Sequence, residues 1–427
     1  MAAVVPQTIL TFLTTIEPAR LEPLKALLAA IDAYDPAGEW PPLPFAALSR
    51  LHFTSLVVLE DGEDGFEPYL VFEHNFDGTL DPYLDDLYQV GADGLHQIYS
   101  HCRGYAGTGP GDRDAIIGYL RAHVLKPDAA YVGAPGRTVG RISREQALRA
   151  ALEATADALV ADRSADQAPA PLRRRLQDAV RQRPDSAWAE EPAPPRITAG
   201  ERAVRWGRLL GAGLLAVVLL PVLLPLLIVF LVVLRVKERG DPTAIPVPEA
   251  DQVGLLLTRE DRIVQNHMAS LSLVKPGRFR RRTLRTVLWA TSLIAGVSYK
   301  GTLSGLDTLH FAHWVLIDDG QRLLFLTNYD GSWENYLDDF IDRAALGLTG
   351  IWSNTVNFPR TRFLVFGGAR DEPRFKAIAR STQRYTNVWY SAYPHLTVRA
   401  IDNTSSIRED LFRPLGESAA RRWLWRL

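Results

Sequence analysis

The residues best suited to chemistry belong to a twelve-residue motif that the chain contains twice. NFDGTLDPYLDD begins at Asn75, and NYDGSWENYLDD begins at Asn328, which is 328 − 75 = 253 positions later. A carboxylate such as Asp77 or Asp330 can move a proton in general acid–base chemistry. The same residues can instead end a strand, with glycine making the turn and the next hydroxyl residue capping a helix. Both interpretations stay open, and the turn-and-cap role is favoured because folding alone accounts for its presence in both copies.

Histidine and arginine supply the other candidates. His52 and His310 occupy equivalent positions in the two copies, which favours a structural role for both. His395 stands where the first copy has Gly136, and Arg399 follows it by four residues. A functional site in a duplicated chain tends to lie where the copies differ, so His395 and Arg399 are candidate site residues. Two further histidines that only the second copy has are His267 and His313.

The remaining motifs give little sign of other chemistry. The adjacent pairs Asp85–Asp86 and Asp338–Asp339 diverge on a helix, so they indicate a solvated edge, and we expect no metal site. There is no phosphate-binding loop, zinc-protease motif or nucleophile elbow.

Composition argues against several classes of protein. Lys and Arg total 48 against 49 for Asp and Glu, a net charge of −1, so we expect no nucleic-acid partner. The single cysteine, Cys102, can form neither an intramolecular disulfide nor a cysteine zinc site, and it fits a reducing compartment. The N-terminal stretch lacks the basic start of a signal peptide and predicts a strand.

Similarity between the copies extends well beyond the motif. LHFTSLVVLEDG from Leu51 matches LHFAHWVLIDDG from Leu309, and YVGAPGRTVGRI from Tyr131 matches YSAYPHLTVRAI from Tyr390. Matching blocks in one order identify an internal duplication. Each copy predicts strand, helix, two strands, helix, and a final strand that holds Tyr131 or Tyr390. This β-α-β-β-α-β order is the ferredoxin-like unit, an α+β fold with helices on one face of an antiparallel sheet.

Two such units packed sheet to sheet resemble the dimeric α+β barrel superfamily and, remotely, the dye-decolorising peroxidases, which are also duplicated. NFDGT resembles their GxxDG motif, but His74 and Thr327 replace the first glycine of that motif. The resemblance implies haem as a possible cofactor, the motif aspartates on its distal side, and His395 as the candidate ligand. Arg399 is then the candidate distal arginine, although four residues is too short a separation for it and His395 to flank one haem.

The most apolar segment lies between the copies. Residues 209–234 carry no charge over 26 positions, more than the roughly 20 residues that span a bilayer. Pro221 and Pro225 lie at its centre and favour a bend, and both flanks are basic. A re-entrant hairpin and a single kinked span both remain open. The hairpin is favoured because the two sheets can cover each other only within one compartment.

The expected organisation is repeat 1 over 1–160, an Ala/Pro/Arg-rich linker over 161–200, a membrane segment over 201–240 and repeat 2 over 241–427. The resemblance covers about residues 7–150 and 260–412 at the level of topology. The linker predicts a short helix near residues 172–182. Two roles for its arginines stay open, contact with anionic lipid headgroups or plain solvation in the linker. These arginines are Arg173, Arg174, Arg175, Arg181 and Arg183.

We therefore expect a membrane-associated oxidoreductase, distantly peroxidase-like, acting on an apolar or lipid-phase substrate. The alternative is a non-catalytic membrane-bound ligand-binding or scaffold protein. The expected partners are the lipid bilayer and an apolar small molecule, and both repeats are expected on the cytoplasmic side of the membrane. These expectations of function rest on likeness of fold, which does not by itself determine activity.

Overall fold

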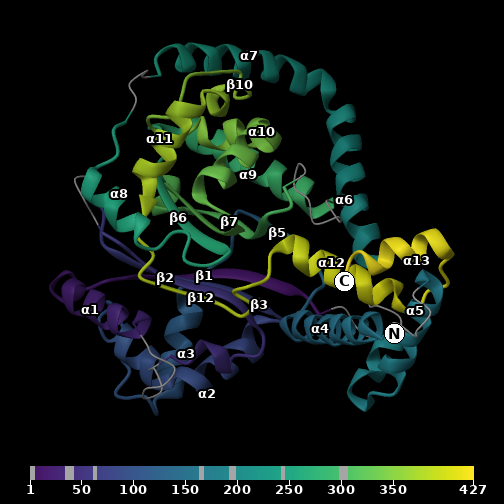
Figure 1. Cartoon of the computed structure of the whole chain (residues 1–427). Coiled ribbons are helices and arrows are strands. Elements are labelled where there is room, and N and C mark those ends of the chain that lie inside the picture. Colours follow the sequence, from purple (N-terminus) through teal and green to yellow (C-terminus); the bar gives the residue numbers. More distant parts are fainter. Residues whose placement is uncertain are drawn as a thin grey trace.

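The computed structural model describes the chain except for residues 1–4, 34–42, 61–64, 163–167, 192–198, 242–245 and 298–305 (Figure 1). It is an α+β structure with two antiparallel five-stranded sheets. The first sheet has the order β12 (Val388–Ser391), β2 (Leu51–Leu59), β3 (Tyr69–Asp77), β1 (Gln7–Thr15) and β4 (Val124–Leu125). The second has the order β11 (Gln383–Arg384), β6 (Gln265–Leu273), β8 (Arg322–Asp330), β7 (Leu309–Ile317) and β5 (Ala129–Val132).

The last strand of each copy crosses to the sheet of the other copy. β5 pairs with β7, with Tyr131 opposite Ala312, and β12 pairs with β2, with Tyr390 opposite Thr54. The prediction that the last strand of each copy pairs within its own sheet is therefore wrong. The two-residue strands β4 and β11 instead occupy the sheet edges beside β1 and β6. Crossing satisfies the backbone groups that β2 and β7 would otherwise leave unpaired at a sheet edge.

A glycine allows one of these crossings. The backbone N–H of Gly133, just after β5, donates to the carbonyl of His310 at 2.8 Å. A Cβ at this position would lie 1.8 Å from the carbonyl oxygen of Leu309, so only glycine permits the close approach.

The two sheets pack face to face and carry helices on their outer faces. Between them lies an apolar layer that includes Val57 and Val71 of the first sheet and Leu271, Val315 and Leu324 of the second. The outer face of the first sheet is covered by α1 (Leu21–Asp32), α2 (Leu80–Tyr99) and α3 (Arg113–Ala122). That of the second is covered by α9 (Arg278–Val297), α10 (Trp333–Trp352) and α11 (Glu372–Thr382). Because both faces of each sheet are covered, every residue of β2 and β8 is buried, instead of every second one.

The residues after each crossing strand build a separate helical cluster. It consists of α4 (Val139–Ala161), α5 (Pro169–Arg181), α12 (Val398–Leu411) and α13 (Glu417–Leu424), packed around Leu152, Leu176 and Trp423. The predicted helix near residues 172–182 is confirmed as α5. Arg173, however, is buried and donates to the carbonyls of Asp410, Leu411 and Arg413, so it cannot meet a lipid headgroup.

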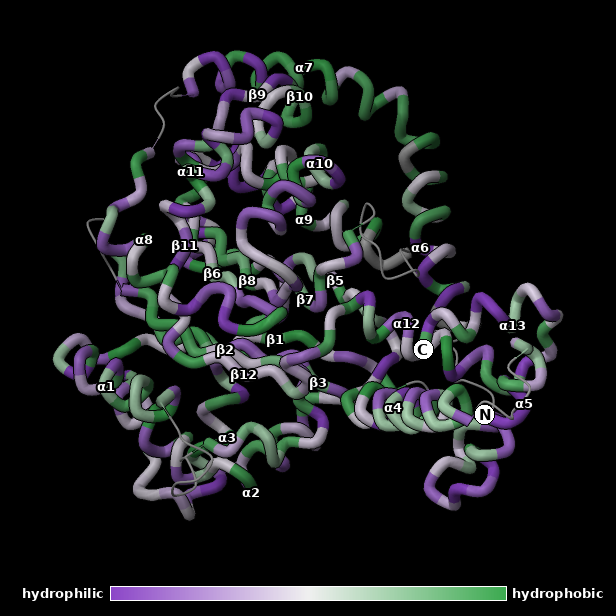
Figure 2. The backbone as a smooth tube through the Cα atoms, viewed as in Figure 1, coloured by the Kyte–Doolittle hydropathy of each residue, from purple (hydrophilic) through white to green (hydrophobic). Residues whose placement is uncertain are grey.

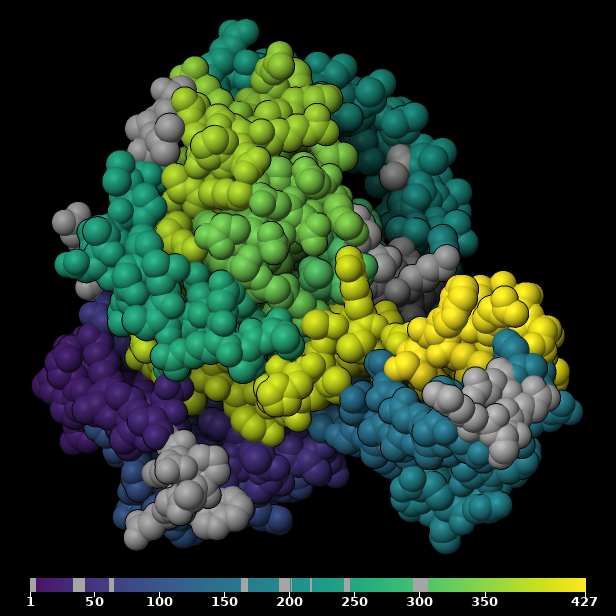
Figure 3. Space-filling view, in the orientation of Figure 1, coloured from purple at the N-terminus to yellow at the C-terminus, as the bar shows by residue number. Residues whose placement is uncertain are grey.

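The apolar segment forms two helices, α6 (Ala199–Val218) and α7 (Leu220–Arg239), which meet at Leu219 and arch over the second half (Figures 1 and 3). Pro221 falls in the first turn of α7, where its missing N–H costs no helix hydrogen bond, and Pro225 lies inside the helix. By length and composition, α7 could cross a membrane, which is weak evidence by itself. Figure 2 colours much of α7 as hydrophobic, and most of its large apolar side chains are exposed.

Candidate functional site

A buried carboxylate lies between the two sheets, in a layer that we call the seam. Glu73 of β3 has no exposed surface and accepts hydrogen bonds from both sheets. Ser55 (2.9 Å) and His267 (3.0 Å) contact its Oε2, and Asn75 (2.9 Å) and Asn328 (3.2 Å) donate to its Oε1. The two asparagines are the first residues of the repeated motif. The duplication therefore places two equivalent amides around one carboxylate.

Glu73 is ionised in this environment. Burial alone would raise its pKa, but the hydrogen bond and charge of His267, the charge of His313 and the hydrogen bond from Asn75 outweigh burial and lower the pKa to about 2. A carboxylate only accepts, so Nε2 of His267 carries the hydrogen of their shared bond. The other ring nitrogen, Nδ1, lies 2.9 Å from the hydroxyl of Thr386. Carboxylate, imidazole and hydroxyl in this order form the arrangement in which a histidine acts as a general base.

A second histidine lies close to the same carboxylate. Nδ1 of His313 is 3.8 Å from Oε1 of Glu73, and its Nε2 is 2.9 Å from the hydroxyl of Thr11. Burial lowers the pKa of His313 to about 4, although the charge of Glu73 acts in the opposite direction. The His313 ring is therefore neutral at pH 7, and the seam carries the negative charge on Glu73.

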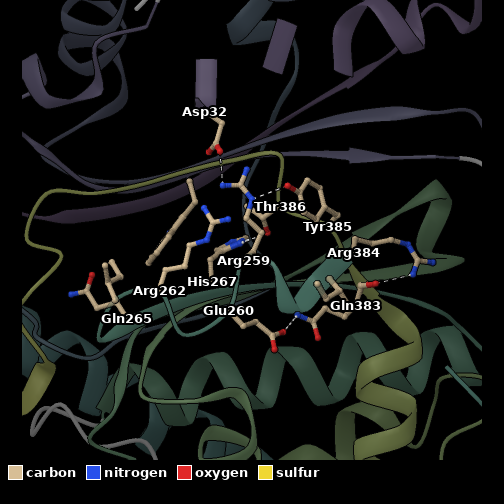
Figure 4. Close-up of a pocket in the computed structure, with 13 residues that line it drawn as sticks. Asp32, Arg259, Glu260, Arg262, Gln265, His267, Gln383, Arg384, Tyr385 and Thr386 are labelled. Carbon is tan, nitrogen blue, oxygen red and sulfur yellow. Dashed lines mark hydrogen bonds and ion pairs between the residues drawn. The ribbon is translucent and has the colours of Figure 1, made fainter. Parts of the chain in front are cut away.

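His267 connects the seam to an open pocket of about 270 Å³, which we call the seam pocket (Figure 4). The pocket lies between the end of α8 (Ala250–Leu257), the start of β6 and the segment that joins β11 to β12. Trp389 forms part of its wall and stacks near His267, with 6.5 Å between ring centroids. Its other polar lining residues include Arg259, Arg262, Gln383, Arg384, Tyr385 and Thr386.

The charges of the seam pocket favour an anion. Of its two carboxylates, Asp32 pairs with Arg259 at 2.6 Å, and Glu260 pairs with Arg380 at 2.5 Å. Arg262 is exposed, and no carboxylate among the described residues pairs with it. Figure 4 shows Arg259, Arg262 and His267 directed into the same space. An anionic group placed there would meet guanidinium donors that suit a carboxylate or phosphate.

The site lies where the two copies differ. His267 corresponds to position 267 − 258 = 9, an isoleucine, and His313 to position 313 − 258 = 55, a serine. Glu73 corresponds to position 73 + 253 = 326, a leucine. One half thus provides the carboxylate and the other provides both histidines. Sequence reasoning noted the histidines but missed Glu73, whose signal was a single charge within the apolar strand YLVFEHNF.

The motif aspartates lie elsewhere, in two equivalent buried pairs. Oδ1 of Asp77 is 3.0 Å from Nε2 of His52, and its Oδ2 accepts from the N–H of Val139, the first residue of α4, at 2.8 Å. The equivalent contacts in the second half are His310–Asp330 at 2.8 Å and Val398–Asp330 at 2.8 Å. Each aspartate thereby ties a sheet to the helix that follows a crossing strand, and a carboxylate at a helix N-terminus is favourable. These contacts support the structural role of His52, His310 and both aspartates. Of the two hydroxyl residues expected to cap the helix after the turn, Ser332 caps α10, whereas the side chain of Thr79 makes no cap hydrogen bond to α2.

The residues proposed for haem do not form a haem pocket. His395 is exposed, and Arg399 is an exposed side chain that makes two hydrogen bonds to Asp307, at 2.8 and 2.9 Å. A haem ligand needs a site shielded from water, and Asp77 and Asp330 already use both carboxylate oxygens. We therefore assign no haem chemistry to Asp77, Asp330, His395 or Arg399.

Comparison with family models, with curated proteins and with solved structures finds no match to this chain.

Replacing Asp77 or Asp330 by asparagine is expected to destabilise the fold by about 1–3 kcal/mol, because an amide nitrogen would then face a buried N–H donor. Chemical denaturation of the purified protein measures this loss. Asp339→Asn is the control: Asp339 is half-buried on α10 and pairs with Arg343 at 3.6 Å, a contact that should contribute less than about 0.5 kcal/mol. A stable D77N protein that has lost ligand binding would instead assign Asp77 to a functional site.

Proposed function

We propose that the chain is a membrane-attached protein that binds a small anionic molecule in the seam pocket and uses His267 to accept a proton from it. The observation that carries this proposal is the series Glu73–His267–Thr386. It joins a buried, ionised carboxylate to the wall of an arginine-lined pocket.

The proposed chemistry is general-base catalysis. The pocket arginines would hold the carboxylate or phosphate of the ligand and so orient its reacting part toward Thr386 and His267. The hydroxyl of Thr386 would give its own proton to Nδ1 of His267 and take in its place the proton that the ligand releases. The imidazolium that results is stabilised by Glu73, which stays ionised, as in other histidine–carboxylate pairs.

Membrane attachment belongs to the same proposal and is assigned to the arch of α6 and α7. Its support is the exposed apolar surface of α7 and the attachment of α7 to the second half. β5 and β12 interleave the two halves, so one bilayer cannot separate them. This arrangement supports a re-entrant insertion, and we place both halves on the cytoplasmic side as part of the proposal. The equivalent orders β4-β1-β3-β2 and β11-β6-β8-β7 also favour paired ferredoxin-like units of the dimeric α+β barrel type.

Two other functions remain as candidates. A protein that binds the same anion without turnover is favoured by the fully hydrogen-bonded Glu73, which also holds the sheets together. A peroxidase-like oxidoreductase acting on an apolar substrate, which the sequence resemblance implies, would need a haem ligand other than the exposed His395. An absorption spectrum of the protein purified in detergent tests the oxidoreductase, since that function requires a Soret band.

Calorimetry on the full chain in detergent tests the binding proposal, with benzoate as the anion and benzamide as its neutral counterpart. Benzoate should bind and benzamide should not. Arg262→Gln should weaken binding by at least about tenfold, as expected for one charged hydrogen bond. The control Arg413→Gln, an exposed residue outside the pocket, should not. Equal binding of benzamide, or unchanged benzoate affinity in R262Q, would contradict the proposal.

A further inference from the structure

A second cavity, of about 910 Å³, lies between α7 and α9 and is far larger than the seam pocket. We call it the arch groove. One wall is apolar and consists of leucines of α7 from Leu220 to Leu227 together with Phe230. The other wall belongs to α9 and includes Arg278, Arg282 and Thr286. At one end the rings of Phe230 and Phe279 stack, with their centroids 5.3 Å apart, and join the two walls.

The cationic side of the groove is available for a ligand. Arg278 and Arg282 lie one helical turn apart on α9, both are exposed, and neither has an ion-pair partner among the described residues. Lys237 adds a third positive charge, 5.9 Å from the ring of Phe279. Arg281 and Arg285 of the same helix differ, because both reach the backbone carbonyl of Asp319.

The C-terminal end of α7 is fixed to the second half, which gives the groove a defined width. Buried Glu238 accepts hydrogen bonds from the hydroxyl of Thr361 and from the backbone N–H groups of Phe363 and Leu364, each at 2.9 Å. Just after α7, Asp241 pairs with Lys275 at 2.7 Å and with Arg280. The apolar wall is therefore held beside the cationic one.

We propose that the arch groove binds one acidic phospholipid. Its phosphate would lie between Arg278 and Arg282, and an acyl chain would follow the leucines of α7. From Leu220 to Phe230 the helix is about 15 Å long, enough to cover much of one chain. Guanidinium groups suit a phosphate, and basic residues near an anionic lipid attract its headgroup. The inference rests on the proposed membrane attachment of α6 and α7 but not on the seam pocket.

Native mass spectrometry of the full chain in a zwitterionic detergent tests this assignment, with dioleoyl phosphatidylglycerol, dioleoyl phosphatidylcholine and oleate as probes. One phosphatidylglycerol should be retained in preference to phosphatidylcholine. Arg278→Gln with Arg282→Gln should reduce that retention at least about fivefold. Arg281→Gln with Arg285→Gln removes the same charge from the same helix and should leave retention unchanged.

The assignment is overturned if the R278Q/R282Q protein retains phosphatidylglycerol like the wild type, if phosphatidylcholine binds equally well, or if only oleate is retained. Flotation with phosphatidylcholine vesicles separates this failure from that of membrane attachment. If the wild type does not float, the attachment of α6 and α7 is wrong. If it floats but shows no arginine-dependent retention, only the lipid site is wrong.

Discussion

Neither half of the chain is expected to fold as a stable monomer when it is produced alone. A fragment of residues 5–160 keeps β5 but loses β12, the neighbour of β2, and exposes the inner face of its sheet. A fragment of residues 260–427 loses β5, the neighbour of β7, in the same way. Large apolar faces and open sheet edges favour aggregation or self-pairing.

Size-exclusion chromatography with light scattering, together with circular dichroism, measures the outcome. Each fragment alone should be aggregated or dimeric, whereas co-expression of the two should yield a soluble one-to-one complex. The co-expressed pair is the matched control, because it contains the same residues with the crossing strands restored. A monomeric, cooperatively folded single half would contradict the interleaved arrangement.

Stability should fall steeply as the pH is lowered from about 6.5 to 2. Burial lowers the pKa of His313 to about 4 and that of His74 to about 3, from 6.5, so the unfolded chain binds protons there that the folded chain does not. Below pH 6.5 each histidine therefore favours unfolding. The pKa of Glu73 is lowered from 4.5 to about 2, so its stabilising contribution is complete above pH 4.5 and is lost as the pH falls toward 2. These groups contribute roughly 3 to 5 kcal/mol each over their windows, His74 the most, since one pKa unit is about 1.4 kcal/mol.

Urea denaturation at a series of pH values measures this dependence. His313→Gln should flatten the curve between pH 6.5 and 4. Glu73→Gln should cost about 3 kcal/mol at pH 7, because it leaves buried donors facing an amide, and should flatten the curve below pH 4.5. His395→Gln changes an exposed histidine and serves as the control, with no change in slope. A pH-independent stability between 6.5 and 4 in the wild type would show that the buried histidines are not held neutral.

Local features of the fold could be predicted from the sequence, but the pairing of its last strands could not. Apolar runs and their spacing identified β1, β6, α2 and α5, because those patterns depend on neighbouring residues. The destination of β5 and β12 depends on which sheet edge lacks a partner, which is a property of the assembled halves. The two copies have similar last strands, and nothing local distinguishes pairing within a copy from pairing across copies.

Only part of the candidate site could be recognised in the sequence, because its residues come from distant parts of the chain. His267 and His313 were noted because the first copy lacks them, but Glu73 lies 194 positions before His267. Only the packing of the two sheets brings them together. His395 and Arg399 also mark a difference between copies, yet they lie on the surface, where a sequence change needs no functional reason.

Cysteine labelling in cells tests most directly whether both halves lie on one side of the membrane. Single cysteines at Ala161, at the end of α4, and at Ala250, at the start of α8, would be exposed on either side of the arch. The background is Cys102→Ser, which removes the buried native thiol. With a membrane-impermeant maleimide, neither site should label in intact cells, and both should label after lysis. Labelling of one site but not the other in intact cells would place the two halves in different compartments and contradict the interleaved, one-sided structure.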